Sequence, residues 1–176
     1  MRIVRDEATK NAVADLVAEG DRIQWSDRRF RRELVAWMHP NRTKSRDGMP
    51  GYAFGFGELM SLAGPLVMRT FDMGGGRAAQ DRELAEGSPA LAVLGTETDT
   101  PVEWLGAGQA LGKVLLRARA EGVYASYLNQ RIEVPELRPR LRDVVGASGL
   151  PQLLLRMGYG TEVRPTPRRS ATEVSM

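Results

Sequence analysis

The chain contains no cysteine, which removes disulfide bonds, thiolate catalysis and cysteine-ligated metals from consideration. A single histidine, His39, likewise excludes a metal site built from several histidine ligands. No apolar run approaches the roughly 20 residues that a membrane-spanning helix needs. Residues 1–7 are largely charged and lack the apolar core of a signal peptide. We therefore expect a cytoplasmic protein without disulfides, a bound metal or a membrane segment.

Lysine is also scarce, because only Lys10, Lys44 and Lys113 are lysines and the other 22 of the 25 basic residues are arginines. The formal net charge is +3 and the sequence pI is about 9.6. Such a bias can reflect genomic base composition as easily as selection for an anionic ligand. Length, at 176 residues, and composition, 42% hydrophobic and 27% charged, are ordinary for a single soluble domain.

Hydrophobic periodicity predicts an α+β fold. We expect a single domain over residues 1–176, with a helical segment at 1–25 and an extended basic tail at 161–176. Three apolar runs of strand length should pair in one sheet covered by helices on both faces, giving three layers. The predicted strands are 89–96, 123–129 and 152–158, and the predicted helices are 6–20, 27–38, 58–71, 77–86, 101–121 and 135–145.

Several local signals set the expected boundaries of these elements. Gly20 is a plausible stop for the first helix, and Ser26 resembles the N-cap of the second. Gly64-Pro65 should bend or break the helix that begins at Glu58. Gly74-Gly75-Gly76 has the composition of a flexible joint.

Residues 101–121 form the clearest predicted helix. Gly106, Gly108 and Gly112 are poor helix formers, so three of them in one helix suggest close approach by another element or a ligand. Six apolar residues should mark its buried side: Trp104, Leu105, Leu111, Val114, Leu115 and Ala118.

The last quarter of the chain carries the most information. It runs Glu121-Gly-Val-Tyr-Ala-Ser-Tyr-Leu-Asn-Gln130, continues through Val134–Arg138 and Pro151–Gly160, and closes on Pro165-Thr-Pro-Arg-Arg169. This arrangement resembles the C-terminal half of the flavin-dependent NAD(P)H nitroreductase family, in its Acg-like branch. The resemblance extends upstream through the 101–121 helix and, more faintly, to Val13.

The resemblance implies a nitroreductase-like three-layer α/β/α sandwich with a mostly antiparallel central sheet. It implies an oxidoreductase that uses FMN to pass electrons from NAD(P)H to nitroaromatic or quinone acceptors, with no side chain needed as nucleophile or general base. Ser126, Tyr127 and Asn129 match the edge of the flavin ring. Arg168 and Arg169 match the basic tail that reaches the flavin phosphate, where the forked guanidinium donors suit the anion.

The family builds its flavin site between two subunits or two fused halves. An N-terminal segment rich in Arg and Ser, or a Ser-x-x-Asn-x-Gln-Pro-Trp pattern in the Acg-like branch, supplies much of that site, and neither is present here. The resemblance therefore implies either a homodimer or a complementary nitroreductase half as the partner.

Other interpretations remain open on the residues alone. The chain could be a catalytically silent relative that sequesters flavin or serves as a structural subunit. Taken without the resemblance, 125–129 could be a strand with one polar face and Arg168-Arg169 a solvated terminus. Tyr52, Phe54 and Phe56 could form a lid over a planar ring or cover the core.

A third class of function, an anion- or nucleic-acid-binding module, would use the most basic stretch of the chain. Acidic neighbours partly neutralise this stretch and it lacks regular aromatic interleaving, so we expect a solvated helix face and no nucleic-acid partner. Its basic residues are Arg28, Arg29, Arg31, Arg32, Arg42, Lys44 and Arg46.

Overall fold

The computed structural model describes residues 1–175, whose contacts form two compact units. Unit 1 comprises Met1–Gln24 and Gly74–Thr161. Unit 2 comprises Trp25–Met73 and the C-terminal residues from Glu162. Compact units need not fold independently, so the single-domain organisation stays a prediction. None of the helices described over residues 1–175 is long and apolar enough to cross a membrane.

Unit 1 is built on a four-stranded sheet in which every neighbouring pair is antiparallel. Its strands lie in the order β1-β4-β6-β5. They are β1 (Arg2–Val4), β4 (Ala90–Thr96), β6 (Leu150–Gly158) and β5 (Tyr124–Tyr127). The three strands predicted from apolar runs are thus confirmed as neighbours, and the α+β fold with a mostly antiparallel sheet is confirmed with them.

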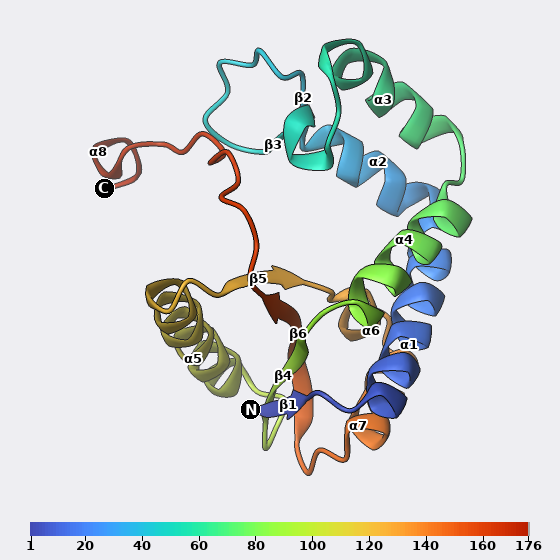
Figure 1. Ribbon diagram of the computed structural model, residues 1–176. Coiled ribbons are helices and arrows are strands. Elements are labelled where there is room, and N and C mark those ends of the chain that lie inside the picture. Colours follow the sequence, from blue (N-terminus) through green and yellow to red (C-terminus); the bar gives the residue numbers. More distant parts are fainter. Residues whose placement is uncertain (176) are drawn as a thin grey trace. The chain divides into compact units, whose positions relative to one another are not determined.

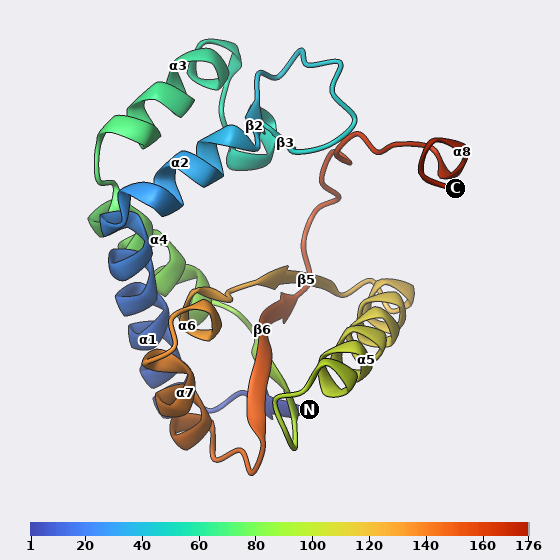
Figure 2. The same cartoon turned by 180° about the vertical axis from the view of Figure 1, so that it is seen from behind.

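Helices cover both faces of this sheet, as the two views show (Figure 1, Figure 2). On one face lies α5 (Pro101–Ala120), and on the other lie α4 (Gly74–Glu86), α6 (Gln130–Glu133), α7 (Leu137–Val145) and the unit 1 part of α1 (Glu7–Ser26). Unit 1 therefore has the expected three layers.

Strand β4 is buried on both faces, as its continuous apolar run predicts. Leu91 and Val93 belong to the main core beneath α1, α4 and α7. Ala92 and Leu94 alternate with them and are also buried, and Leu94 lies opposite Ala107 on α5. The other buried members of the main core are Val4, Val13, Ala14, Leu16, Val17, Ala85, Leu128, Val134, Leu137, Leu141, Val145 and Leu154.

The predicted end of the first helix was wrong, because α1 continues through Gly20 to Ser26. Gly20 serves packing instead: a Cβ atom added there would lie 2.9 Å from Cβ of Gln130 on α6. The N-cap of α2 (Arg28–Ala36) is Asp27 rather than Ser26, since Asp27 Oδ1 accepts from the Arg29 amide at 2.7 Å.

The predicted joint at 74–76 and the predicted break of the helix at Gly64-Pro65 were also wrong. Gly74-Gly75-Gly76 is not a joint but the first turn of α4. In unit 2, α3 (Glu58–Thr70) runs unbroken through Gly64 and Pro65. A Cβ atom at Gly64 would lie 2.7 Å from Cε2 of Phe56, so close packing there fixes the helix more strongly than proline disfavours it.

Unit 2 has its own small apolar core around Trp25, Met38 and Met68. Phe54 and Phe56 pack against this core, so these two aromatics cover it as one of the two sequence interpretations held. The remaining elements of unit 2 are β2 (Met38–His39), which pairs in parallel with β3 (Met49–Pro50), then η1 (Gly51–Phe54) and α8 (Ala171–Val174).

Helix α5 presents bulky apolar side chains away from its sheet. Ala107 and Ala118 are its buried residues, whereas Trp104 is 51% and Leu105 72% exposed. The predicted buried side was therefore wrong at these two positions. Small residues allow the helix to approach β4 and β5. Leu111, Val114 and Leu115 are half-buried, whereas Trp104, Leu105 and Leu116 are exposed.

Candidate functional site

The predicted flavin edge lies on β5, which is an edge strand of the sheet. Ser126 pairs with Arg156 and Tyr127 with Leu155 of β6. Ser126 is half-buried, and Tyr127 is 51% exposed. Because β5 has a strand on only one side, its other backbone edge makes no ladder within this sheet.

The two faces of β5 differ in their surroundings. The Arg119 guanidinium of α5 lies 4.8 Å from the centre of the Tyr124 ring. Side chains alternate along a strand, so Ser126 lies on the same face as Tyr124 and Tyr127 lies on the opposite one. Ser126 and Tyr127 therefore cannot present both side chains to one face of a planar ligand, whereas the strand edge offers backbone groups from both residues.

Asn129 has a structural partner. Its Oδ1 accepts from the backbone amide of Leu154 at 3.0 Å, and the amide of Leu128 donates to the carbonyl of Leu154 at 2.9 Å. These two bonds continue the contact with β6 past the end of β5. The assignment of Asn129 to the flavin edge stays a prediction, and the structure shows that this side chain also fixes the chain that leaves β5.

The tail of unit 2 is held by Tyr52. The Tyr52 hydroxyl donates to the carbonyl of Pro165 at 2.9 Å, and the Arg164 guanidinium lies 4.2 Å from the centre of the Tyr52 ring. Among the three aromatics of the 52–56 segment, Tyr52 thus binds the tail. These contacts direct the extended residues that lead to Arg168 and Arg169, whose side chains are exposed.

Arg168 and Arg169 line a cavity of about 510 Å³ within unit 2. Arg46 lines the same cavity, so three guanidiniums reach one space. The other lining residues are Trp37, Asp47, Gly48, Met49 and Val174. In the sequence, Arg46 belongs only to a basic stretch. No local pattern predicts that it lies near a tail more than a hundred residues further along the chain.

Carboxylates balance part of this positive charge. Arg46 forms an ion pair with Glu173. Hydrogen bonds from the backbone and hydroxyl of Ser170, followed by Arg46 and Arg169, lower the pKa of Glu173. A hydrogen bond from Ser45 at 2.6 Å, with smaller effects of Arg169 and His39, lowers the pKa of Asp47. Both acids are therefore ionised at neutral pH, yet the lining holds more guanidiniums than carboxylates.

This cavity fits the phosphate end of FMN in its donor chemistry. Guanidiniums supply planar pairs of N–H donors that match a phosphate, and Trp37 is half exposed beside them at 53%. The residues that would hold the phosphate are Arg46, Arg168 and Arg169. The flavin-edge residues lie in unit 1, on other parts of the chain.

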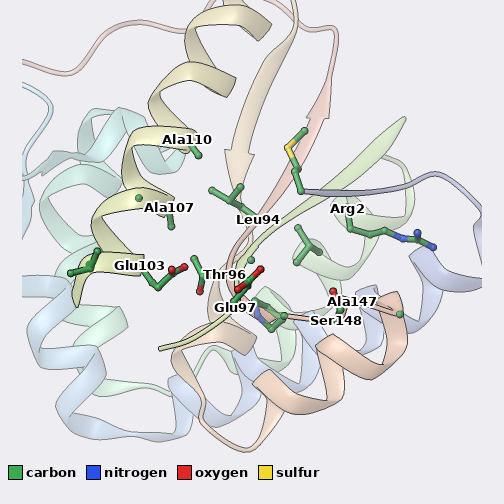
Figure 3. A pocket seen from close by; sticks show the side chains of 17 residues that line it. Arg2, Leu94, Thr96, Glu97, Glu103, Ala107, Ala110, Ala147 and Ser148 are labelled. Atoms are coloured by element: carbon green, nitrogen blue, oxygen red, sulfur yellow. The ribbon is translucent and has the colours of Figure 1, made fainter. Parts of the chain in front are cut away.

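A larger cavity of about 850 Å³ lies in unit 1 between β4, α5 and residues 146–149 (Figure 3). Ala107 and Ala110 of α5 point toward Leu94 and form an apolar wall, while Glu97 and Glu103 contribute carboxylates. None of the residues predicted to bind the cofactor lines this cavity.

The basic stretch that suggested a nucleic-acid module is not one free surface. Arg31 is buried and donates to the carbonyl of Trp25. Arg42 Nε pairs with Glu58 at 3.0 Å, and Arg46 is paired with Glu173. Exposed cations remain at Arg28, Arg29 and Arg32 on α2.

Comparison with known proteins supports the nitroreductase resemblance. The chain is 32% identical over 178 aligned residues to "Putative NAD(P)H nitroreductase Rv3131" of Mycobacterium tuberculosis (strain ATCC 25618 / H37Rv), an alignment covering 98% of this chain and 50% of that protein. It is 33% identical over 104 residues to "Uncharacterized protein Rv3127" of the same strain, covering 56% of this chain and 30% of that protein. No protein-family model matches the chain.

The chain therefore spans about half the length of the nitroreductase relative that it matches. Because the similarity covers nearly the whole chain, it supports a relationship to the nitroreductase family. The Acg-like branch stays a prediction.

Proposed function

We propose that the chain binds FMN and is the functional half, or one subunit, of a cytoplasmic NAD(P)H-dependent oxidoreductase of nitroreductase type. The observation that carries this proposal is the similarity to the nitroreductase relative over 98% of the chain. The cavity lined by Arg46, Arg168 and Arg169 supports it independently, since it offers the donors that a flavin phosphate needs.

In this proposal the chain's own residues bind and orient the cofactor. In unit 2 the three arginines would hold a flavin phosphate, and in unit 1 the outer edge of β5 at Ser126 and Tyr127, together with Asn129, would meet a flavin ring. The flavin, when bound, supplies the transfer of electrons from NAD(P)H to a nitroaromatic or quinone acceptor. The protein then needs no nucleophile or general base.

The proposed partner is a second copy of this chain. Leu105 and Leu116 are 72% and 76% exposed on α5, and Gly108 lies between them. A Cβ atom at Gly108 would meet no atom within 4 Å, so no contact within unit 1 explains a residue that weakens the helix. An apolar helix face with a glycine at its centre suits close packing against another helix. A complementary half of a longer nitroreductase is the alternative partner.

Reconstitution tests the function directly. Purified protein mixed with FMN and freed of excess ligand should be yellow, and it should oxidise NADH or NADPH when a quinone is added. A yellow protein that oxidises neither nucleotide would support the alternative of a silent flavin-sequestering relative. A colourless protein at tens of micromolar, together with salt-sensitive binding to DNA, would favour the anion-binding module instead.

A further inference from the structure

Three charged residues of unit 1 are buried and take no part in the site described above. Asp21 of α1, Asp81 of α4 and Arg131 of α6 are 2%, 8% and 0% exposed, respectively. Charged side chains are almost never fully buried unless other groups compensate them, because removing a charge from water is costly. Such a cluster therefore needs an explanation.

The cluster joins three helices. Gln130 Nε2 donates to Asp81 Oδ2 at 2.9 Å, and Gln130 also forms a hydrogen bond with Asp21. Gly20 lets α1 approach this point, because its missing side chain leaves room for Gln130. Gln130 and Arg131 are the first two residues of α6 and follow the predicted flavin edge directly in sequence.

Arg131 connects the cluster to the end of β5, since its Nη2 donates to the carbonyl of Leu128. Its Nε and Nη1 have no hydrogen-bond partner among residues 1–175. Burial lowers the pKa of the Arg131 guanidinium to about 9, against the opposing charges of Asp21 and Asp81. Arg131 is therefore a cation at neutral pH, stabilised by two carboxylates and by one backbone carbonyl.

We propose that Arg131 is a positioning residue that fixes the backbone of residues 126–129, and that the charges of Asp21 and Asp81 stabilise its buried guanidinium. The amide of Leu128 and the side chain of Asn129 are both bonded to Leu154. The carbonyl of Leu128 accepts a hydrogen bond from Arg131. These three hydrogen bonds tie the chain that leaves β5 to β6 and to α6.

The inference rests on the proposed function in one respect, the role of Ser126, Tyr127 and Asn129 at the flavin. The structural part stands without it. The test therefore measures the segment in flavin-free protein first and flavin binding second, so that the two ideas fail in different ways.

The first measurement is amide hydrogen exchange of the full chain without FMN, comparing Arg131→Met with Arg138→Met. Arg138 is a matched control, because its Nε donates to the carbonyl of Pro151 at 2.7 Å in the same unit but away from 126–131. We expect Arg131→Met to speed exchange in peptides covering 126–133 by about tenfold or more, from the loss of one charge-assisted bond. Arg138→Met should leave those peptides unchanged.

Conservative variants keep the test decisive if Arg131→Met does not fold. Arg131→Lys preserves a cation and should lie between wild type and Arg131→Met. The Asp21→Asn, Asp81→Asn double variant leaves the arginine but removes the two negative charges that stabilise it, and it should also raise exchange at 126–133. Equal exchange in all variants, or a uniform rise across the whole chain, would overturn the positioning role.

The second measurement is a fluorescence titration with FMN. Arg131→Lys should weaken FMN binding by about tenfold and shift the absorption band of the bound flavin, whereas Arg138→Lys should do neither. If wild type binds no FMN, the proposed function fails and hydrogen exchange alone decides the inference. If exchange rises locally but flavin affinity and spectrum stay unchanged, Arg131 does not position the flavin edge.

Discussion

At the residue scale, Asp99 shows how one side chain can organise several elements of unit 1. It accepts from Arg138 through two bonds of 2.7 and 3.0 Å, from Trp104 Nε1 at 2.6 Å and from Gln152 Nε2 at 3.1 Å. These donors, Arg138 foremost, hold the pKa of Asp99 well below its usual range. The bond to Trp104 also accounts for the position of an exposed indole at the start of α5.

We predict that Asp99→Asn lowers the stability of the protein at neutral pH and removes part of its sensitivity to acid. A depressed pKa means that the folded state favours the carboxylate, so its contribution is present above about pH 4 and is lost as the pH falls toward the folded pKa. Urea unfolding at pH 7 and pH 3 should show the variant weaker than wild type at both, with a smaller difference at pH 3, because the contribution begins to fall only below the pKa of the unfolded carboxyl. Asp143→Asn, which removes an exposed carboxylate paired with its neighbour Arg142, is the control.

The tail arginines give a second prediction at this scale. Arg168→Ala with Arg169→Ala should weaken FMN binding by roughly 2–4 kcal/mol, because the phosphate loses charge-assisted donors while contacts to the ring remain. Fluorescence titration measures the affinity. Folding should barely change, since both side chains are exposed near the end of the chain.

Arg28→Ala with Arg29→Ala makes the same change in net charge on an exposed part of α2 and serves as the control. Equal affinities of wild type and the tail variant would remove Arg168 and Arg169 from the site. A similar loss in both double variants would indicate a general effect of charge rather than a phosphate site.

At the element scale, α5 has apolar residues on two sides, one facing its own sheet and one facing solvent. One side packs through Ala107 and Ala118 on the sheet, and the other carries Leu105 and Leu116 into solvent. Exposed apolar patches of this kind commonly mark interfaces. We therefore propose this outer side as the place where a second copy of the chain would bind.

We predict that Leu105→Glu with Leu116→Glu shifts the protein toward the monomer, weakening association by at least about tenfold through buried like charges. Thermal unfolding of the monomer should change little, since both side chains are already exposed. Sedimentation velocity over a range of concentrations measures the association. Lys113→Glu on the same helix provides a control for added negative charge, because Lys113 is exposed but not apolar.

At the scale of the whole molecule, the chain spans about half the length of its nitroreductase relative. A site shared between two copies makes flavin binding depend on association. We predict that the fraction of FMN bound falls on dilution together with the dimer, because each half of the site then lacks its complement. Sedimentation monitored by flavin absorbance measures the fraction of bound FMN and the fraction of dimer in one experiment. The Leu105→Glu, Leu116→Glu variant is measured in parallel. Undiminished FMN binding by a monomer would show that one chain carries a sufficient site.

Much of the architecture was already readable in the chain. The apolar run at 89–96 is buried on both faces, and the strands at 123–129 and 152–158 lie in the same sheet, as their patterns predicted. The signal in each case is local, because the spacing of apolar side chains sets which backbone geometry can bury them.

The glycines at 20 and 74–76 led to wrong predictions of a helix end and a flexible joint. The low helix preference of glycine is a weak effect, and tertiary packing overrode it.

What the sequence by itself determined is therefore the long helices, three of the four strands of the main sheet, the α+β class and the resemblance that points to a flavin. Only the tertiary structure brought Arg46 to the tail arginines, buried Asp21, Asp81 and Arg131 in unit 1, and turned Leu105 outward. Each of these depends on neighbours far away in sequence. A charged or apolar residue acquires its role from the groups that fold against it, and local periodicity carries no information about which groups those are.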